Sequence, residues 1–180
     1  MQNRDYKRVK NDIIPFLKQD VNAYCTTMFD YYGLLRNFRG VPVEGNLTTI
    51  EKADIVEQAL HKDIISYFGD KFFPNHFRPY IQMHEHETLP FSDPHAFTIG
   101  IYRQDLAKNF EYIRKAFPTS EDINDESNTM PSKRIKKLCK NYNKPLNGTL
   151  AAIVIGIETI REECKHFNQW VKKLEALCIT

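Results

Sequence analysis

The chain has 180 residues, of which 42% are hydrophobic and 27% charged, with a formal net charge of +2. This length suits one domain with one core, and no apolar run approaches the roughly 20 residues that a membrane crossing needs. Residues 1–12 are polar and unlike a secretory signal, and the four cysteines include no Cys-x-x-Cys pair. We therefore expect a cytoplasmic protein with reduced thiols, outside the membrane and without a zinc ribbon. The small net charge gives no global argument for nucleic-acid binding.

The N-terminal segment predicts a helix, a strand and a loop. Apolar residues at helical spacing predict a helix over Tyr6–Lys18, which Pro15 should kink or shorten. Ala23–Phe29 contains threonine and aromatic residues and predicts a strand buried on both faces, with Asp30 at its C-terminal end. The glycine-containing segment from Tyr31 to Asn46 predicts a loop.

A second helix and a second strand follow. Thr48 and Glu51 form a capping-box pattern before apolar residues at three- and four-residue steps, which predicts a helix as far as Phe68. Phe77–His84 predicts a strand, with Pro79 near its start, where a missing amide is tolerated. The order strand, helix, strand indicates a right-handed crossover between parallel strands.

The second half of the chain predicts mainly helices and one acidic loop. Pro131 suits the first position of a helix, and breaks are expected at Gly156 and near His166. The fold class that we predict is α/β, with a mostly parallel sheet flanked by helices and a largely helical C-terminal half. The predicted segments are one or two helices within His95–Phe117, a polar loop over Thr119–Thr129, a helix through residues 132–142, and two or three helices within Leu150–Cys178.

Acidic side chains follow both predicted strands. Ligands of open α/β sheets bind beyond the carboxyl ends of strands, so Asp30 is a candidate metal ligand or catalytic acid; the alternative is that it caps the loop after it. In a continuing strand, His84 and His86 would share one face and Glu85 and Glu87 the other, a pairing that is lost if a helix begins near His86. The two glutamates suit Mg²⁺, or they are solvated acids. A His-x-His zinc site lacks a third ligand at recognisable spacing.

A basic cluster follows Pro131. The first-turn amides of a helix that begins there, together with Ser132, Lys133 and Arg134, are candidates to bind a phosphate. The alternative is a solvated basic face. The wider cluster also contains Lys136, Lys137, Lys140 and Lys144.

Cys164 and His166 lie two residues apart in the sequence, which invites comparison with a Cys-His catalytic pair. Sequence adjacency does not place a nucleophile beside its base, because the two must meet in space together with an orienting third group. We therefore expect Cys164 to be a small apolar residue of a terminal amphipathic helix.

Four segments in order resemble a bacterial family catalogued as domain of unknown function 4276, and the resemblance covers nearly the whole chain. Members of this family resemble Toprim domains, the metal-dependent fold that handles phosphodiesters in topoisomerases, primases and the OLD nucleases. Many such Toprim proteins accompany ATPases in phage-defence loci. The segments are VNAYCTTMFDYYGLL, RPYIQMHEHETLPFSDP, EDINDESNTMPSKRIKKL and GIETIREECKHFNQWVKKLEAL.

The resemblance implies a single Toprim-like domain over residues 1–180 that acts on nucleic acid with Mg²⁺, beside an ATPase partner. Asp30 matches the first acid of the Toprim Asp-x-Asp step, whereas Tyr32 replaces the second. Glu85 and Glu87 would add metal or acid-base chemistry, with His84 as a further catalytic candidate, and Lys133 would contact a phosphate. The family's first strand and its glutamate are expected upstream of this sequence. The alternative is a non-catalytic module that binds nucleic acid or a protein partner.

Overall fold

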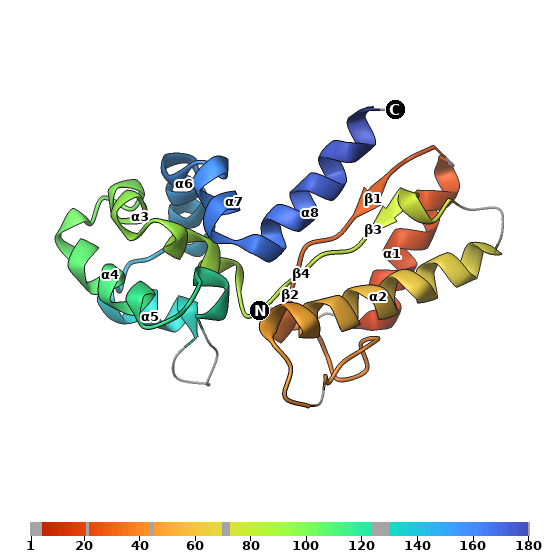
Figure 1. Cartoon of the computed structure of the whole chain (residues 1–180), viewed down its shortest axis with the longest axis horizontal. Helices are drawn as coiled ribbons and strands as arrows, with labels where there is room; N and C mark the ends of the chain where they lie inside the picture. The colour runs from red at the N-terminus through yellow and green to blue at the C-terminus, as the bar shows by residue number, and fades with distance from the viewer. Residues whose placement is uncertain (1–4, 21, 44, 70–72, 124–129, 180) are drawn as a thin grey trace. The chain divides into compact units, whose positions relative to one another are not determined.

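The computed structural model describes residues 5–20, 22–43, 45–69, 73–123 and 130–179 (Figure 1). The chain divides into two compact units, Met1–Met83 and His84–Thr180. The first unit combines helices with parallel strands, and the described part of the second unit is helical. The α/β class and the helical C-terminal half are therefore confirmed, while the assignment of both units to one domain stays a prediction.

Each predicted strand of the first unit forms two short strands. β1 pairs in parallel with β3, and β2 pairs in parallel with β4, so that the described residues hold two two-stranded sheets where we predicted one larger sheet. Pro79, which lacks an amide hydrogen, lies between β3 and β4. The elements of this unit are α1 (Tyr6–Gln19), β1 (Cys25–Thr26), β2 (Phe29–Asp30), α2 (Thr49–Phe68), β3 (Phe77–Arg78) and β4 (Ile81–Gln82).

The core of the first unit lies between its helices and its strands. α2 runs beside both strand pairs (Figure 1) and contacts β3 and β4. We predicted that the strand at β1 would be buried on both faces. That prediction is wrong, because Thr26 is exposed and Cys25 is only half-buried. The buried apolar side chains include Val9, Ile13, Leu17, Val56, Leu60, Ile64, Phe77 and Ile81.

The helix ends of the first unit follow local sequence signals. The Asp5 side chain accepts a hydrogen bond from the Lys7 amide at 2.7 Å and so begins α1, which continues through Pro15. The capping box of α2 is confirmed, since Thr48 Oγ1 accepts from the Glu51 amide at 3.3 Å and Glu51 Oε2 accepts from the Thr48 amide at 2.7 Å.

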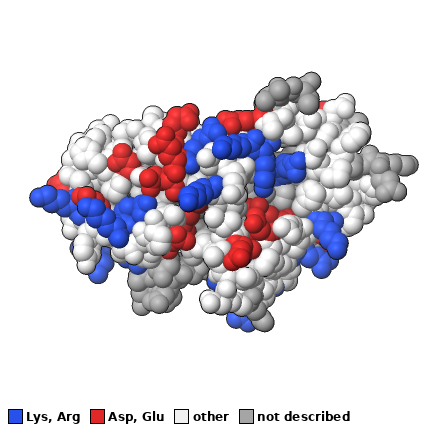
Figure 2. All heavy atoms as spheres, viewed as in Figure 1, with Lys and Arg blue, Asp and Glu red and all other residues white. Residues whose placement is uncertain are grey.

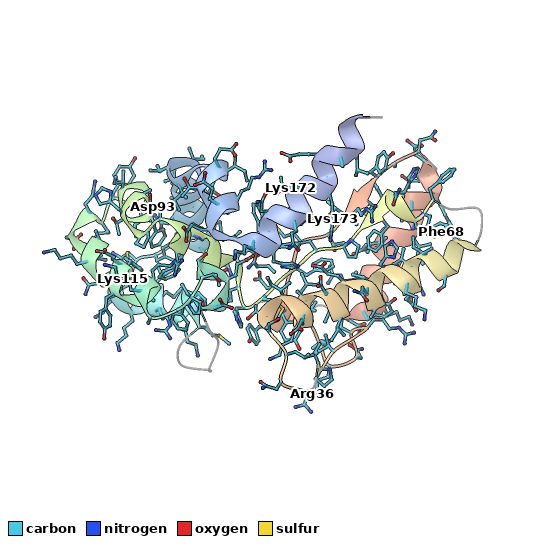
Figure 3. All side chains as sticks on the ribbon, viewed as in Figure 1. Arg36, Phe68, Asp93, Lys115, Lys172 and Lys173 are labelled. Atoms are coloured by element: carbon cyan, nitrogen blue, oxygen red, sulfur yellow. The ribbon has the colours of Figure 1, made fainter. Side chains whose placement is uncertain are left out.

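The second unit is built from short helices that pack closely. Asp93 begins α3 by accepting a hydrogen bond from the Ala96 amide at 2.9 Å (Figure 3), and α3 then packs along α6. The break at Gly156 is confirmed, and a further break at Cys164 precedes His166. The helices are α3 (Pro94–Gly100), α4 (Ala107–Lys115), α5 (Pro131–Leu138), α6 (Lys144–Ile155), α7 (Ile157–Glu163) and α8 (Lys165–Glu175).

Two predictions for the second unit need correction. The helix that begins at Pro131 ends at Leu138, because Cys139 adopts an extended conformation. The predicted polar loop begins with a short 3₁₀ helix, Ser120–Asp122, in which Glu121 is buried; the rest of that loop, residues 124–129, lies outside the described residues. Among the described helices, none combines the length and the apolar character needed to cross a membrane.

Candidate functional site

Asp30 lies at the end of a strand, as the sequence predicts. It is the last residue of β2 and pairs in register with Gln82 of β4. Its side chain makes no capping hydrogen bond to the 3₁₀ turn that follows at Tyr31–Gly33. Capping of that turn is therefore not the role of the Asp30 carboxylate. Asp30 belongs to the first unit and the two glutamates belong to the second, and a metal site shared among them stays a prediction.

The segment His84–Glu87 does not continue the strand. His84 has a positive φ of 65°, and a 3₁₀ helix begins at His86 and runs to Ser92. The alternation that would place the two histidines on one face and the two glutamates on the other is therefore lost. His84 is buried, as are Glu85 and Glu87, so neither glutamate is the solvated acid of the alternative interpretation.

Glu85 caps the basic helix α5. Its Oε2 accepts a hydrogen bond from the Ser132 amide at 2.8 Å, and its Oε1 accepts one from the Ser132 hydroxyl at 2.9 Å. The residue before α5, Met130, has no side chain that can cap the helix, so Glu85 supplies an acceptor for the helix terminus from 47 residues away. A carboxylate at this end also interacts favourably with the helix dipole.

Glu87 forms an ion pair with Lys144 of α6. The side chain of Glu87 is 2% exposed, and the ammonium nitrogen of Lys144 lies 2.6 Å from its Oε2. Burial raises the pKa of Glu87, the Lys144 ammonium opposes that rise, and the charge of Glu85 adds to it. Lys144 was predicted as part of the basic cluster, but the structure pairs it with an acid.

Helices α4 and α5 form a basic cleft of about 380 Å³. α4 contributes Lys108, Asn109, Tyr112 and Ile113, and α5 contributes Lys133, Arg134, Lys137 and Leu138. Figure 2 shows Lys and Arg side chains gathered over the region where Figure 1 draws α4, at the left of the view. This basic cleft joins two helices whose cations lie far apart in the sequence. Its lysines are exposed to solvent, so a phosphate site and a solvated basic face both stay open.

The backbone at the start of α5 is engaged by protein groups. The Ser132 amide donates to Glu85, and the amides of Lys133 and Arg134 both donate to the Met130 carbonyl, at 2.9 and 3.0 Å. The side chains of the basic cleft are therefore better placed to contact a phosphate than the amides of this terminus. The role of Ser132 as a phosphate contact stays a prediction.

Cys164 has the environment of a packed thiol. It is fully buried, with its sulfur 3.1 Å from Ser120 Oγ and 3.4 Å from Ser92 Oγ. Burial raises its pKa to about 11, whereas the two serine hydroxyls act in the opposite direction. A thiol that stays neutral at physiological pH is a poor nucleophile, which agrees with the rejection of a Cys-His catalytic pair.

Sequence reasoning did not find several residues of these sites. Lys108 and Tyr112 lie four residues apart, a spacing that places them on one face of α4 but does not identify α5 as their neighbour. Glu121 accepts hydrogen bonds from the amides of His166 and Phe167, both at 3.0 Å, and so caps α8. No local pattern in the sequence indicates that contact.

Comparison with known proteins identifies the family to which the chain belongs. No curated protein and no solved structure matches the chain. The family described as Domain of unknown function (DUF4276) matches residues 1–175, which is nearly the whole sequence. The chain therefore belongs to the DUF4276 family.

Proposed function

We propose that this protein is a nuclease or nuclease-derived domain, Toprim-like in fold, which binds nucleic acid through the basic cleft and acts on phosphodiester bonds with Mg²⁺. The observation that carries the proposal is the cleft between α4 and α5, in which Lys108, Lys133, Arg134 and Lys137 converge. A role in phage defence beside an ATPase partner is part of the proposal through the family resemblance alone.

The basic cleft suits a phosphate backbone better than a single small anion. Its cations come from two helices, and three of them, Lys108, Lys133 and Lys137, are exposed to solvent. Tyr112 is 80% exposed and also lines the cleft, so that it offers a flat ring to an unstacked base. The guanidinium of Arg134 lies 5.3 Å from the centre of the Phe117 ring, which helps to hold its orientation.

One of the proposed acids, Glu87, has an oxygen that could bind a hard divalent cation. Glu87 Oε1 is buried and has no hydrogen-bond partner among the residues that the structure describes, and carboxylate oxygens are the ligands that Mg²⁺ prefers. Within the second unit, Glu87 would hold such an ion and Glu85 is a further proposed ligand. Asp30, in the first unit, stays a proposed ligand through the family resemblance alone. Mg²⁺ bound there would supply charge stabilisation to a phosphodiester oxygen. His84 stays a candidate for acid-base chemistry.

A second candidate function is a non-catalytic module that binds nucleic acid or a protein partner. The specific observation that favours it is the engagement of the acids: Ser132 occupies both oxygens of Glu85, and Lys144 pairs with Glu87. A metal ion would have to compete with a lysine ammonium at Glu87. In this module the carboxylates stabilise the fold, and the basic cleft binds nucleic acid or a protein partner.

Binding is tested by the salt dependence of affinity for a short DNA and a short RNA. Lys133→Ala with Lys137→Ala should weaken binding and reduce the magnitude of the slope of log K against log salt by about 1 to 2. The reason is that a variant with fewer phosphate contacts releases fewer counterions when it binds. Lys136→Ala with Lys140→Ala is the matched control, since both lysines are exposed and neither lines the cleft. Equal effects of the two double variants would reject the basic cleft as the binding site.

Cleavage is tested on the same nucleic acids with Mg²⁺ and with a chelator. If the acids hold the metal, Asp30→Asn and Glu87→Gln should each abolish Mg²⁺-dependent cleavage while leaving binding in place. Asp105→Asn, at an exposed acid paired with Arg103, should cleave as the wild type does. Binding without cleavage by the wild type would favour the second candidate, and full cleavage by both acid variants would overturn the assignment of these ligands.

A further inference from the structure

The second unit contains an apolar cavity of about 470 Å³, bordered by the 3₁₀ helix at His86–Ser92 and by α6. Leu89, Pro90 and Ile160 contribute apolar walls, and Gly148 and Ala152 of α6 leave room for a ligand. The cavity is separate from the basic cleft, with which it shares no residue. Its volume lies in the range typical of small-molecule sites.

Two buried polar atoms of the cavity lining have unmet hydrogen-bonding capacity. Glu87 is 2% exposed and Tyr142 is 6% exposed, and both line the cavity. Neither Glu87 Oε1 nor the Tyr142 hydroxyl has a hydrogen-bond partner among the described residues. Leaving a buried polar group unsatisfied costs free energy, so a ligand that satisfies both atoms would recover that cost.

The charges of the cavity favour a neutral ligand. Lys144 also lines the cavity and neutralises Glu87 across 2.6 Å, so that a charged ligand would leave one charge without a counter-ion. Glu87 Oε1 can only accept a hydrogen bond, whereas the Tyr142 hydroxyl can donate or accept one. The matching ligand is largely apolar and carries an N–H donor for Glu87 Oε1 together with a polar atom for the Tyr142 hydroxyl.

We propose that this cavity binds a nucleobase, with an N–H group of the base donating to Glu87 Oε1 and the Tyr142 hydroxyl bonding to the same base. Every common base has a donor and an acceptor on its pairing edge, and that edge is accessible only when the base is unpaired. The choice of a nucleobase among neutral ligands rests on the proposed nucleic-acid function in its second form, the module without metal, because Glu87 Oε1 would hold either the ion or the base. The protein should therefore prefer single-stranded or unpaired nucleotides over a perfect duplex.

Free nucleosides test the proposal, because they carry a base and no phosphate and so do not depend on the basic cleft. Calorimetric titration of the whole chain with adenosine, guanosine, cytidine and uridine should show saturable binding of at least one of them. Ala152→Phe should weaken that binding at least tenfold, since it fills the cavity from an exposed helical position. Ile153→Phe, at the neighbouring exposed residue that does not line the cavity, is the matched control and should bind as the wild type does.

Tyr142→Phe separates hydrogen bonding from the filling of space. The ring stays, and because the hydroxyl has no partner in the described structure, the free energy of unfolding should not fall. Nucleoside binding should weaken by about threefold to tenfold, which corresponds to one neutral hydrogen bond.

The outcomes separate this proposal from the proposed function. Absence of binding by all four nucleosides, or equal binding by wild type and Ala152→Phe, would overturn the nucleobase site. If Lys133→Ala with Lys137→Ala still lowered the salt slope in that case, nucleic-acid binding through the basic cleft would stand without the nucleobase site. Nucleoside binding that is unchanged by Tyr142→Phe would refute the role of its hydroxyl.

Discussion

Gly100 lies where helix α3 closely approaches helix α6, and a substitution there tests this contact. It is the last residue of α3 and faces α6, where a Cβ added to it would lie 2.6 Å from Ala151 Cα and 2.9 Å from the Ala151 nitrogen. Both of these atoms belong to backbone, which cannot move aside as a flexible side chain can. Gly100→Ala therefore requires α3 and α6 to separate.

The size of the effect follows from these distances. Carbon atoms in good contact lie about 3.5 to 4.0 Å apart, so the helices must move by roughly 1 Å. Overpacking of this kind costs about 1 to 3 kcal/mol, and the smaller chain entropy of the unfolded alanine variant offsets about 0.4 to 1 kcal/mol of that. The midpoints of these two ranges, about 2 and about 0.7 kcal/mol, leave a net loss of about 1.3 kcal/mol, which lowers Tm by about 3 to 5 °C in a chain of this length.

Thermal and urea unfolding of matched glycine variants measure this effect. Gly148, in the middle of α6, is the control, because a Cβ there would meet only the Tyr142 hydroxyl at 3.4 Å. Gly148→Ala should raise the free energy of unfolding by about 0.4 to 1 kcal/mol, since alanine favours a helix. If Gly100→Ala is as stable as the wild type, the close contact between α3 and α6 is wrong.

Two further predictions concern the buried acids. Ser132→Ala removes the hydroxyl that donates to Glu85 Oε1 and should lower the free energy of unfolding by about 1.5 to 3 kcal/mol, the range for a hydrogen bond to a charged group; a loss no larger than that of Ser66→Ala, at an exposed serine, would contradict the capping role of Glu85. Because the pKa of Glu87 is raised above its ordinary value of 4.5, the folded state holds this proton more tightly than the unfolded state. Its contribution to stability is therefore full below pH 4.5 and is lost as the pH rises through the folded pKa. Glu87→Gln should flatten this decline in urea titrations at a series of pH values, and an unchanged slope would refute the raised pKa.

The sequence predicted best those elements that local signals determine. The capping box at Thr48 and Glu51, the proline at the start of α5 and the glycine after α6 each act within a few residues, and the structure has all three. The strands were harder, because a strand's length depends on its partner. Each pair extends for only two residues, which neither β propensity nor alternation can reveal.

The candidate site depended on contacts that cross long stretches of sequence. The basic residues after Pro131 were recognised as a cluster, but their grouping with Lys108 requires a fold that brings α4 and α5 to the same cleft. Likewise Lys144 has the same charge as its neighbours in the sequence, and only the fold pairs it with Glu87. Charge patterns therefore showed which residues are chemically capable and left their partners undetermined.

The burial of Glu85 and Glu121 follows one rule that a sequence can partly reveal. Each accepts two hydrogen bonds at the start of a helix, α5 for Glu85 and α8 for Glu121. The residues that precede these helices, Met130 and Cys164, make no side-chain cap. A helix start without a local cap still has amides that need acceptors, so its sequence predicts an acceptor from elsewhere in the chain. Acids in segments that otherwise read as exposed loops are natural candidates, and their burial is then a consequence of helix capping before it is a sign of catalysis.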